Sequence, residues 1–195
     1  MNLLIIDLRI KSINIILESL NINTTCILLD FDNDTEKSLK SKIDALNISY
    51  FETVGIIRIG KYEKYYQLIA NQELSWNPLV NFITYLSNNY NIKLFNFISC
   101  NLATYPNYTD IFDKLENTLN IKVGASIDLI GNGNWTLERS NVNVKDIYFN
   151  DNILNYQYLL DPVLVTPIFY SSDKIYDGTQ SAIINYALPG APGNS

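Results

Sequence analysis

Short apolar runs alternate with helical patterns along residues 1–150, and this alternation restricts the folds open to the chain. The apolar runs have the length of buried strands, at Leu3–Leu8, Cys26–Phe31, Val54–Ile59, Leu94–Ile98 and Ile121–Ile127. Between them, leucine and isoleucine recur at every third or fourth position, as on one helix face. Because helical crossovers connect parallel strands, we predict an α/β domain with three layers, α/β/α, around a mainly parallel twisted sheet.

Capping residues indicate where the predicted helices begin. Side chains that accept from first-turn amides precede three of them, at Ser12, at Asp34 or Thr35, and at Thr109. The remaining helix is expected to open at Asn77-Pro78, because proline fits the first helical position.

Three features place loops around the sheet. Lys61–Trp76 is polar and aromatic, which favours a small hairpin, and Gly131–Asn134 is expected to be a tight turn with a return strand from Trp135. Gly60 and Cys100 each follow a predicted strand, so both belong to the carboxyl edge of the sheet, where such sheets bind ligands.

The character of the sequence changes after about residue 160. Asp161-Pro162 and Thr166-Pro167 interrupt any helix, and the segment 174–182 has the turn and β character of a repeat unit. One such unit cannot bury a core by itself. We therefore predict that residues 1–160 form one domain and residues 161–195 a linker and the start of a β-type repeat segment within a longer protein.

Charge argues against two classes of partner. The net charge is −6 and the sequence pI is near 4.6, whereas binding to phosphate backbones and anionic membranes uses clustered lysine and arginine. We expect no nucleic-acid partner. The start of the chain is interrupted at Asp7 and Arg9, so a conventional secretion signal is not expected, and no apolar run reaches the roughly 18 residues of a membrane span. Membrane insertion is not predicted.

The chain has two cysteines and no histidine. Cys26 and Cys100 make no disulfide framework, and two thiolates cannot complete a four-ligand zinc site. We predict no cofactor. The two thiols are not expected to pair, because strands two and four should lie on opposite sides of strands one and three.

Four segments resemble an N-terminal domain of very long bacterial surface proteins that is itself similar to caspases and gingipains. Leu3–Asp7 resembles its first strand, Arg58–Gly60 aligns with its Ser-His-Gly strand end and Ser99–Asn101 with its cysteine strand end. Ala125–Glu138 resembles its closing motif. Separately, Tyr176–Thr179 is similar to Tyr-Asp-Gly repeats of filamentous adhesins.

The resemblance implies a catalytic pair that this chain cannot form. In caspase-like enzymes a histidine assists a cysteine nucleophile, and the matching positions here are Ile59 and Cys100. Isoleucine accepts no proton, so we predict a pseudoenzyme whose Cys100 is a vestigial, inherited apolar residue. The alternative is a cysteine hydrolase or self-processing protease that uses Cys100 with a base such as Lys61 or Glu63.

Alternating acids at Asp30, Asp32 and Asp34 suggest calcium. The EF-hand pattern also requires glycine and glutamate, but Thr35 and Ser41 hold those positions. A strand-to-helix loop with a capping aspartate explains the acids more simply, so we assign no metal, while calcium binding stays open.

An aromatic and basic stretch is the candidate binding surface. Tyr62, Tyr65 and Tyr66 lie near Arg58, and tyrosine with arginine is typical of interface hot spots. The same rings could instead pack on the domain as a half-buried hairpin, and the sequence does not separate the two. Together these features favour a structural protein: a non-catalytic head or anchor of a surface fibre on a cell or virion, which acts in assembly, adhesion or attachment through protein partners or self-association.

Overall fold

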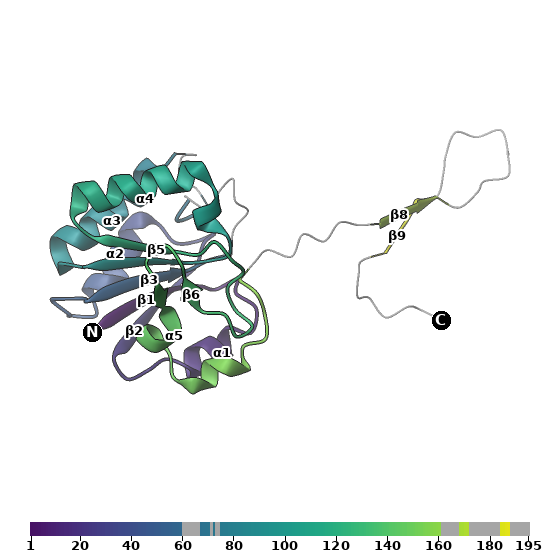
Figure 1. Cartoon of the computed structure of the whole chain (residues 1–195), viewed down its shortest axis with the longest axis horizontal. Coiled ribbons are helices and arrows are strands. Elements are labelled where there is room, and N and C mark those ends of the chain that lie inside the picture. The colour runs from purple at the N-terminus through teal and green to yellow at the C-terminus, as the bar shows by residue number, and fades with distance from the viewer. Residues whose placement is uncertain (60–66, 71, 73–74, 161–167, 172–183, 188–195) are drawn as a thin grey trace. The chain divides into compact units, whose positions relative to one another are not determined.

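The structure is a computed structural model of the whole chain. It describes residues 1–59, 67–70, 72, 75–160, 168–171 and 184–187 (Figure 1). Two compact units are present, Met1–Pro162 and Val163–Ser195. In the part that is described, no helix has the length and apolar character needed to cross a membrane.

A five-stranded parallel sheet is the centre of the first unit. Its strands are β1 (Asn2–Asp7), β2 (Thr24–Leu29), β3 (Thr53–Ile57), β4 (Leu94–Ile98) and β5 (Lys122–Ala125). Their order is β2-β1-β3-β4-β5, and every neighbouring pair is parallel. This order confirms the predicted α/β fold. It also confirms that β2, which contains Cys26, and β4, which ends two residues before Cys100, are separated by β1 and β3.

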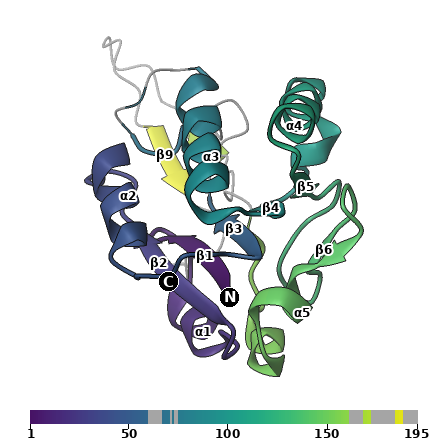
Figure 2. The ribbon, with the colours of Figure 1, turned by 90° about the vertical axis from the view of Figure 1, so that its left-hand side faces the viewer.

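Helices cover both faces of the sheet, which gives the predicted three layers (Figures 1 and 2). One face carries α2 (Glu36–Asp44), α3 (Asn77–Tyr90) and α4 (Pro106–Leu119). The other carries α1 (Ile13–Glu18), α5 (Val144–Tyr148) and the short pair β6 (Thr136–Leu137) and β7 (Val142–Asn143). Two 3₁₀ helices, η2 (Leu102–Thr104) and η3 (Asp151–Asn155), complete the unit.

Alternating strand residues divide the hydrophobic interior into two cores. The first core lies under α2, α3 and α4 and includes Leu3, Ile56 and Phe97. The second lies under α1 and α5 and includes Leu4 and Cys100. Because successive strand side chains point to opposite faces, one strand contributes to both cores.

Helix starts differ in part from the predictions. Thr35 caps α2, since its hydroxyl accepts from Ser38 N and the Ser38 side chain accepts from Thr35 N. Ser12 precedes α1 but makes no side-chain cap bond, because its backbone is left-handed, with φ 53°. Helix α4 begins at Pro106 instead of after Thr109, whose hydroxyl donates to Pro106 O at 2.8 Å. Proline at a first-turn position starts this helix one turn earlier than predicted.

The predicted turn at Gly131–Asn134 is present, with reciprocal backbone hydrogen bonds of 2.8 and 3.1 Å between its end residues. Its outgoing strand is not a return along β5, however. Strand β6 pairs antiparallel with β7, while β5 ends at Ala125. The predicted fifth strand is shortened because the chain beyond it folds into a loop held by side chains.

Asparagine takes the left-handed backbone conformation at most of the non-glycine positions that have it. These are Ser12, Asn47, Asn91, Asn101, Asn120, Asn132 and Asn141. Asn91 and Asn120 end α3 and α4, a position usually held by glycine, because the asparagine side chain tolerates positive φ better than most. The high asparagine content is therefore partly structural.

In the second unit the structure describes one antiparallel pair, β8 (Ile168–Ser171) with β9 (Ile184–Ala187). Residues 174–182, for which turn and β character were predicted, lie outside the described residues. The Tyr176–Thr179 segment lies outside the described residues.

Candidate functional site

The carboxyl edge of the sheet brings together the strand ends that the sequence singled out. Strands β3 and β4 are adjacent, with Ile57 opposite Ile98. Ile59 and Cys100 each lie two residues beyond these partners, at neighbouring strand ends. Cys100 therefore lies at the predicted carboxyl edge, while Gly60, the other residue predicted there, lies outside the described residues.

Cys100 is enclosed in the second core. It is 2% exposed. Its Sγ accepts a hydrogen bond from Ile130 N at 3.2 Å and donates to Ile130 O at 3.6 Å. The nucleophile in cysteine catalysis is an accessible thiolate, whereas this sulfur is buried and contacts one peptide group of the neighbouring loop.

Ile59 offers no replacement for a base. Its side chain is partly buried against the second core, and its carbonyl oxygen accepts a hydrogen bond from Arg9 Nη2 at 3.1 Å. The chain contains no histidine elsewhere. Lys61 and Glu63, the alternative bases, lie outside the described residues.

A buried carboxylate dominates the electrostatics of this edge. Asp7 is 0% exposed and is held by Arg9, with Nε 2.9 Å from Oδ1 and Nη2 2.5 Å from Oδ2. Arg58 adds a second guanidinium, with Nε 3.9 Å from Asp7 Oδ2. Both guanidiniums lie over the ring of Phe31, at 3.9 and 4.9 Å from its centroid. Because a buried charge requires compensation, Asp7 fixes both arginines at the strand ends.

This cluster has a clear effect on protonation. The hydrogen bond with Asp7 raises the pKa of the Arg9 guanidinium above its already high ordinary value, although burial opposes the change. Both arginines therefore remain charged. The cluster neutralises a carboxylate and supplies no proton acceptor to Cys100.

Arg58 does not lie where the predicted binding surface requires it. The side chain is 2% exposed, inside the domain. A surface hot spot needs an exposed guanidinium, so the prediction that Arg58 is a binding residue is wrong. Its guanidinium instead faces the Asp7 carboxylate. Tyr62, Tyr65 and Tyr66 lie outside the described residues, and their binding role stays a prediction.

A loop after β5 closes over Cys100, and sequence reasoning missed how it is held. Glu138 Oε2 accepts from Ser126 Oγ at 2.7 Å and from Ile127 N at 2.9 Å. Asn101 N donates to Asp128 O at 2.9 Å, which ties the loop to the residue after the cysteine. The sequence offered one signal, the acidic residue Glu138 shortly after Gly131–Gly133. Its hydrogen-bond partners depend on the tertiary fold and could not be identified from sequence.

The acids at the end of β2 are occupied by local contacts. Asp30 accepts from Asn33 Nδ2 at 3.0 Å and from the Asp32 and Asn33 amides at 3.2 Å. Asp34 accepts a hydrogen bond from Lys42 Nζ at 2.6 Å. Burial acts to raise the pKa of Asp34, but the hydrogen bonds from Lys42, Asp30 N and Ser38 outweigh burial, so the pKa is lowered. Within the described residues, no group of three acidic or sulfur-bearing side chains is placed to hold a metal ion.

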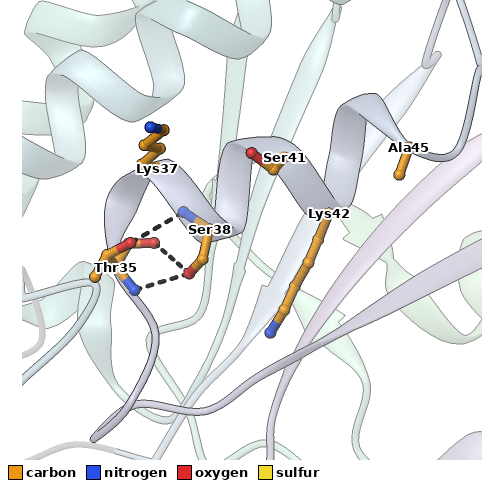
Figure 3. Close-up of a pocket in the computed structure, with 6 residues that line it drawn as sticks. All are labelled: Thr35, Lys37, Ser38, Ser41, Lys42 and Ala45. Carbon is orange, nitrogen blue, oxygen red and sulfur yellow. Dashed lines mark hydrogen bonds between the residues drawn. The ribbon is translucent and has the colours of Figure 1, made fainter.

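Two hollows lie away from Cys100. One of about 560 Å³ runs along α2 and is lined by Thr35, Lys37, Ser38, Ser41, Lys42 and Ala45 (Figure 3). Its polar end is already satisfied, because Thr35 and Ser38 cap each other. The second, of about 480 Å³, lies at the amino ends of β3, β4 and β5 and is lined in part by Glu52, Lys93 and Lys122.

Comparison with known proteins gives one match. No curated protein and no solved structure matches the chain. Residues 3–160, which span the parallel sheet and the described helices of the first unit except for the first residue of β1, match the family described as a domain of unknown function (DUF4347). Since this match covers most of the chain, the protein belongs to that family.

Proposed function

We propose that residues 1–160 form a non-catalytic domain that acts in assembly or attachment, as the head or anchor of a longer fibrous protein on a cell or virion surface. The observation that carries this proposal is the state of Cys100. The thiol is 2% exposed and forms hydrogen bonds with the N–H and the carbonyl oxygen of Ile130, while the neighbouring strand end presents Ile59. An enzyme of the caspase-like class needs an accessible thiolate and a base at these two places.

The assembly part of the proposal rests on the resemblance to surface proteins. The net charge of −6 disfavours nucleic acid and anionic membranes, which leaves protein partners or further copies of the chain. Sedimentation of the full chain over a wide concentration range tests self-association. A chain that stays monomeric throughout and does not bind the intact surface that displays it would contradict the assembly role.

Alkylation of the cysteines tests the non-catalytic part. The full chain is treated with iodoacetamide between about pH 5 and about pH 9, and peptide mass spectrometry assigns the product to Cys26 or Cys100. Cys26 is a built-in reference because it is half-buried, and burial raises the pKa of its thiol. The Cys100→Ala variant is the control for assignment.

We expect Cys100 to react more slowly than Cys26 across this pH range, because its side chain is more deeply buried. Rapid alkylation of Cys100 at neutral pH, with a depressed pKa, would reveal a base and would move the cysteine-hydrolase alternative to first place.

A further inference from the structure

A short segment at the end of the first unit lies against the loop that holds the Cys100 thiol. This segment, Tyr156–Leu160, is called the strap. Leu160 N donates to Ile130 O at 2.8 Å, and Leu159 forms an isolated antiparallel bridge with Gly131. The approach is close, since a Cβ placed on Gly131 would lie 2.2 Å from Tyr158 O.

Two side chains anchor the strap in the second core. Tyr156 is 1% exposed and Leu160 is 0% exposed, and both belong to the same core as Cys100. The Tyr156 ring lies 5.8 Å from that of Trp135. Burial raises the pKa of Tyr156 to about 12, and the nearby Tyr158 and Cys100 groups contribute.

Ile130 connects the strap to the thiol. Its carbonyl oxygen accepts from both Cys100 Sγ and Leu160 N, and its N–H donates to the same sulfur. Displacing the strap removes one of the bonds that fix this peptide group. It also removes two buried side chains from the wall of the second core.

The strap is held less firmly than a strand of the sheet. It makes an isolated bridge instead of a ladder, and Gln157 and Leu159 are exposed. The Tyr156 hydroxyl is buried and has no hydrogen-bond partner among the described residues, which destabilises the closed position. Segments with few buried anchors open locally at lower cost than the core of a domain.

We propose that the strap is a releasable cover, which keeps the Cys100 thiol inaccessible when closed and exposes it when displaced. The cover works whether or not the exposed thiol is catalytic, so the inference is independent of the proposed function. The chain continues from Leu160 into the second unit, so a pull on the following residues acts first on the cover.

Paired variants of the full chain test the cover by iodoacetamide labelling in native buffer. Leu160→Ala removes a buried anchor, and the matched control Leu154→Ala changes a side chain that is 55% exposed. We expect the Cys100-to-Cys26 labelling ratio to rise by about tenfold or more in Leu160→Ala and to stay unchanged in the control. Tyr156→Phe removes the unpartnered hydroxyl, so it should lower the ratio.

A second measurement uses the unaltered chain and does not depend on a variant folding. Labelling of Cys100 is followed at urea concentrations below the unfolding transition, which circular dichroism defines. A rate that rises less steeply with urea than global unfolding supports local release, because less surface is exposed. If Cys100 reacts only as fast as the whole domain unfolds, or if folded Leu160→Ala leaves the ratio unchanged, the cover does not exist.

Discussion

The two faces of the sheet are built in different ways. The first core lies under α2, α3 and α4, which are helices of 9, 14 and 14 residues. The second core lies under α1 and α5, of 6 and 5 residues, together with β6, β7, η3 and the strap. One face is closed by regular helices, and the other by irregular chain held through specific contacts.

Polar groups follow the same division. Cys100 belongs to the second core, and Asn96 Nδ2 donates to Tyr148 Oη at 2.9 Å where α5 meets the sheet. Glycine allows this contact, since a Cβ on Gly124 would lie 2.2 Å from Asn96 Oδ1. Regular helices bury a large apolar surface on the sheet. Irregular chain can in addition place a single peptide group or phenol against one strand residue.

The largest expected effect comes from emptying the first core. Phe97 is 1% exposed, with rings of Phe95 and Phe112 both 4.9 Å away. Phe97→Ala should lower the free energy of unfolding by about 4 kcal/mol, because regular helices cannot collapse into the cavity. Phe149→Ala, the counterpart in the second core, should cost about 3 kcal/mol, because irregular chain relaxes more easily. Urea denaturation measures both, and a larger loss for Phe149 would reverse the comparison.

Removing one oxygen from the second core should have the next largest effect. Tyr148→Phe leaves the Asn96 amide, which is 0% exposed, without the acceptor it has now. We expect a loss of about 1–3 kcal/mol in the free energy of unfolding. Tyr50→Phe is the control, since Tyr50 is 42% exposed. Equal stabilities of the two variants would show that the polar contact contributes nothing.

Helix capping should produce a smaller difference in stability between the two faces. Thr35→Ala removes a reciprocal cap from α2 and should cost about 1 kcal/mol. Ser12→Ala at the start of α1 should cost close to nothing, because that side chain makes no cap bond. Thermal and urea unfolding of the two variants would contradict this prediction if Ser12 proved the more sensitive position.

Acid sensitivity should be concentrated at α2. Folding lowers the pKa of the Asp34 carboxyl group. The ionised carboxylate therefore stabilises the folded chain fully above the ordinary carboxylate pKa of about 3.9. This stabilisation is lost as the pH falls through the lower pKa of the folded state. Asp34→Asn should therefore be less stable than the unaltered chain near neutral pH, and the difference should shrink in acid. Lys145 lowers the pKa of Asp151 on the second face, but that carboxylate is 87% exposed. Asp151→Asn should thus show a weaker pH dependence in urea titrations.

Calcium should have the smallest effect of all. Asp34 is already bonded to Lys42, and Asp30 to the amides of its own loop. We expect millimolar calcium and chelator to leave the melting temperature unchanged. A rise with calcium that Asp30→Asn abolishes would instead establish a metal site on the first face.

The sheet could be predicted from sequence because local patterns determine it. Continuous apolar runs such as Leu3–Ile6 identify buried strands, and helical spacing between them implies parallel pairing. Helix starts were less predictable where signals compete. At α4, Pro106 and Thr109 both fit a helix start, and the helix begins at the proline.

The position of the site on the sheet could be predicted from sequence, but the hydrogen bonds and ion pairs of its side chains could not. Cys100 and Ile59 follow β4 and β3, which are neighbouring strands of the sheet. The bonds from Cys100 to Ile130 and the ion pair of Asp7 with Arg58 join distant segments of the chain, which no local pattern encodes. Arg58 illustrates the difference, because a basic residue beside tyrosines is typical of a surface until a buried acid is known to face it.

The left-handed asparagines carry a consequence for chemical ageing. Asparagine followed by glycine is the pair in which the next backbone nitrogen most readily attacks the side-chain amide and releases ammonia, and asparagine is among the heat-labile residues. Asn132-Gly133 is such a pair, on an exposed turn beside the loop that holds Cys100. Stored protein should gain a carboxylate there first, which peptide mass spectrometry after mild alkaline incubation would detect. The Asn132→Asp variant carries the charge of the deamidated form. The rate at which the Asn132 amide is lost would therefore determine how long the loop beside Cys100 keeps its native charge.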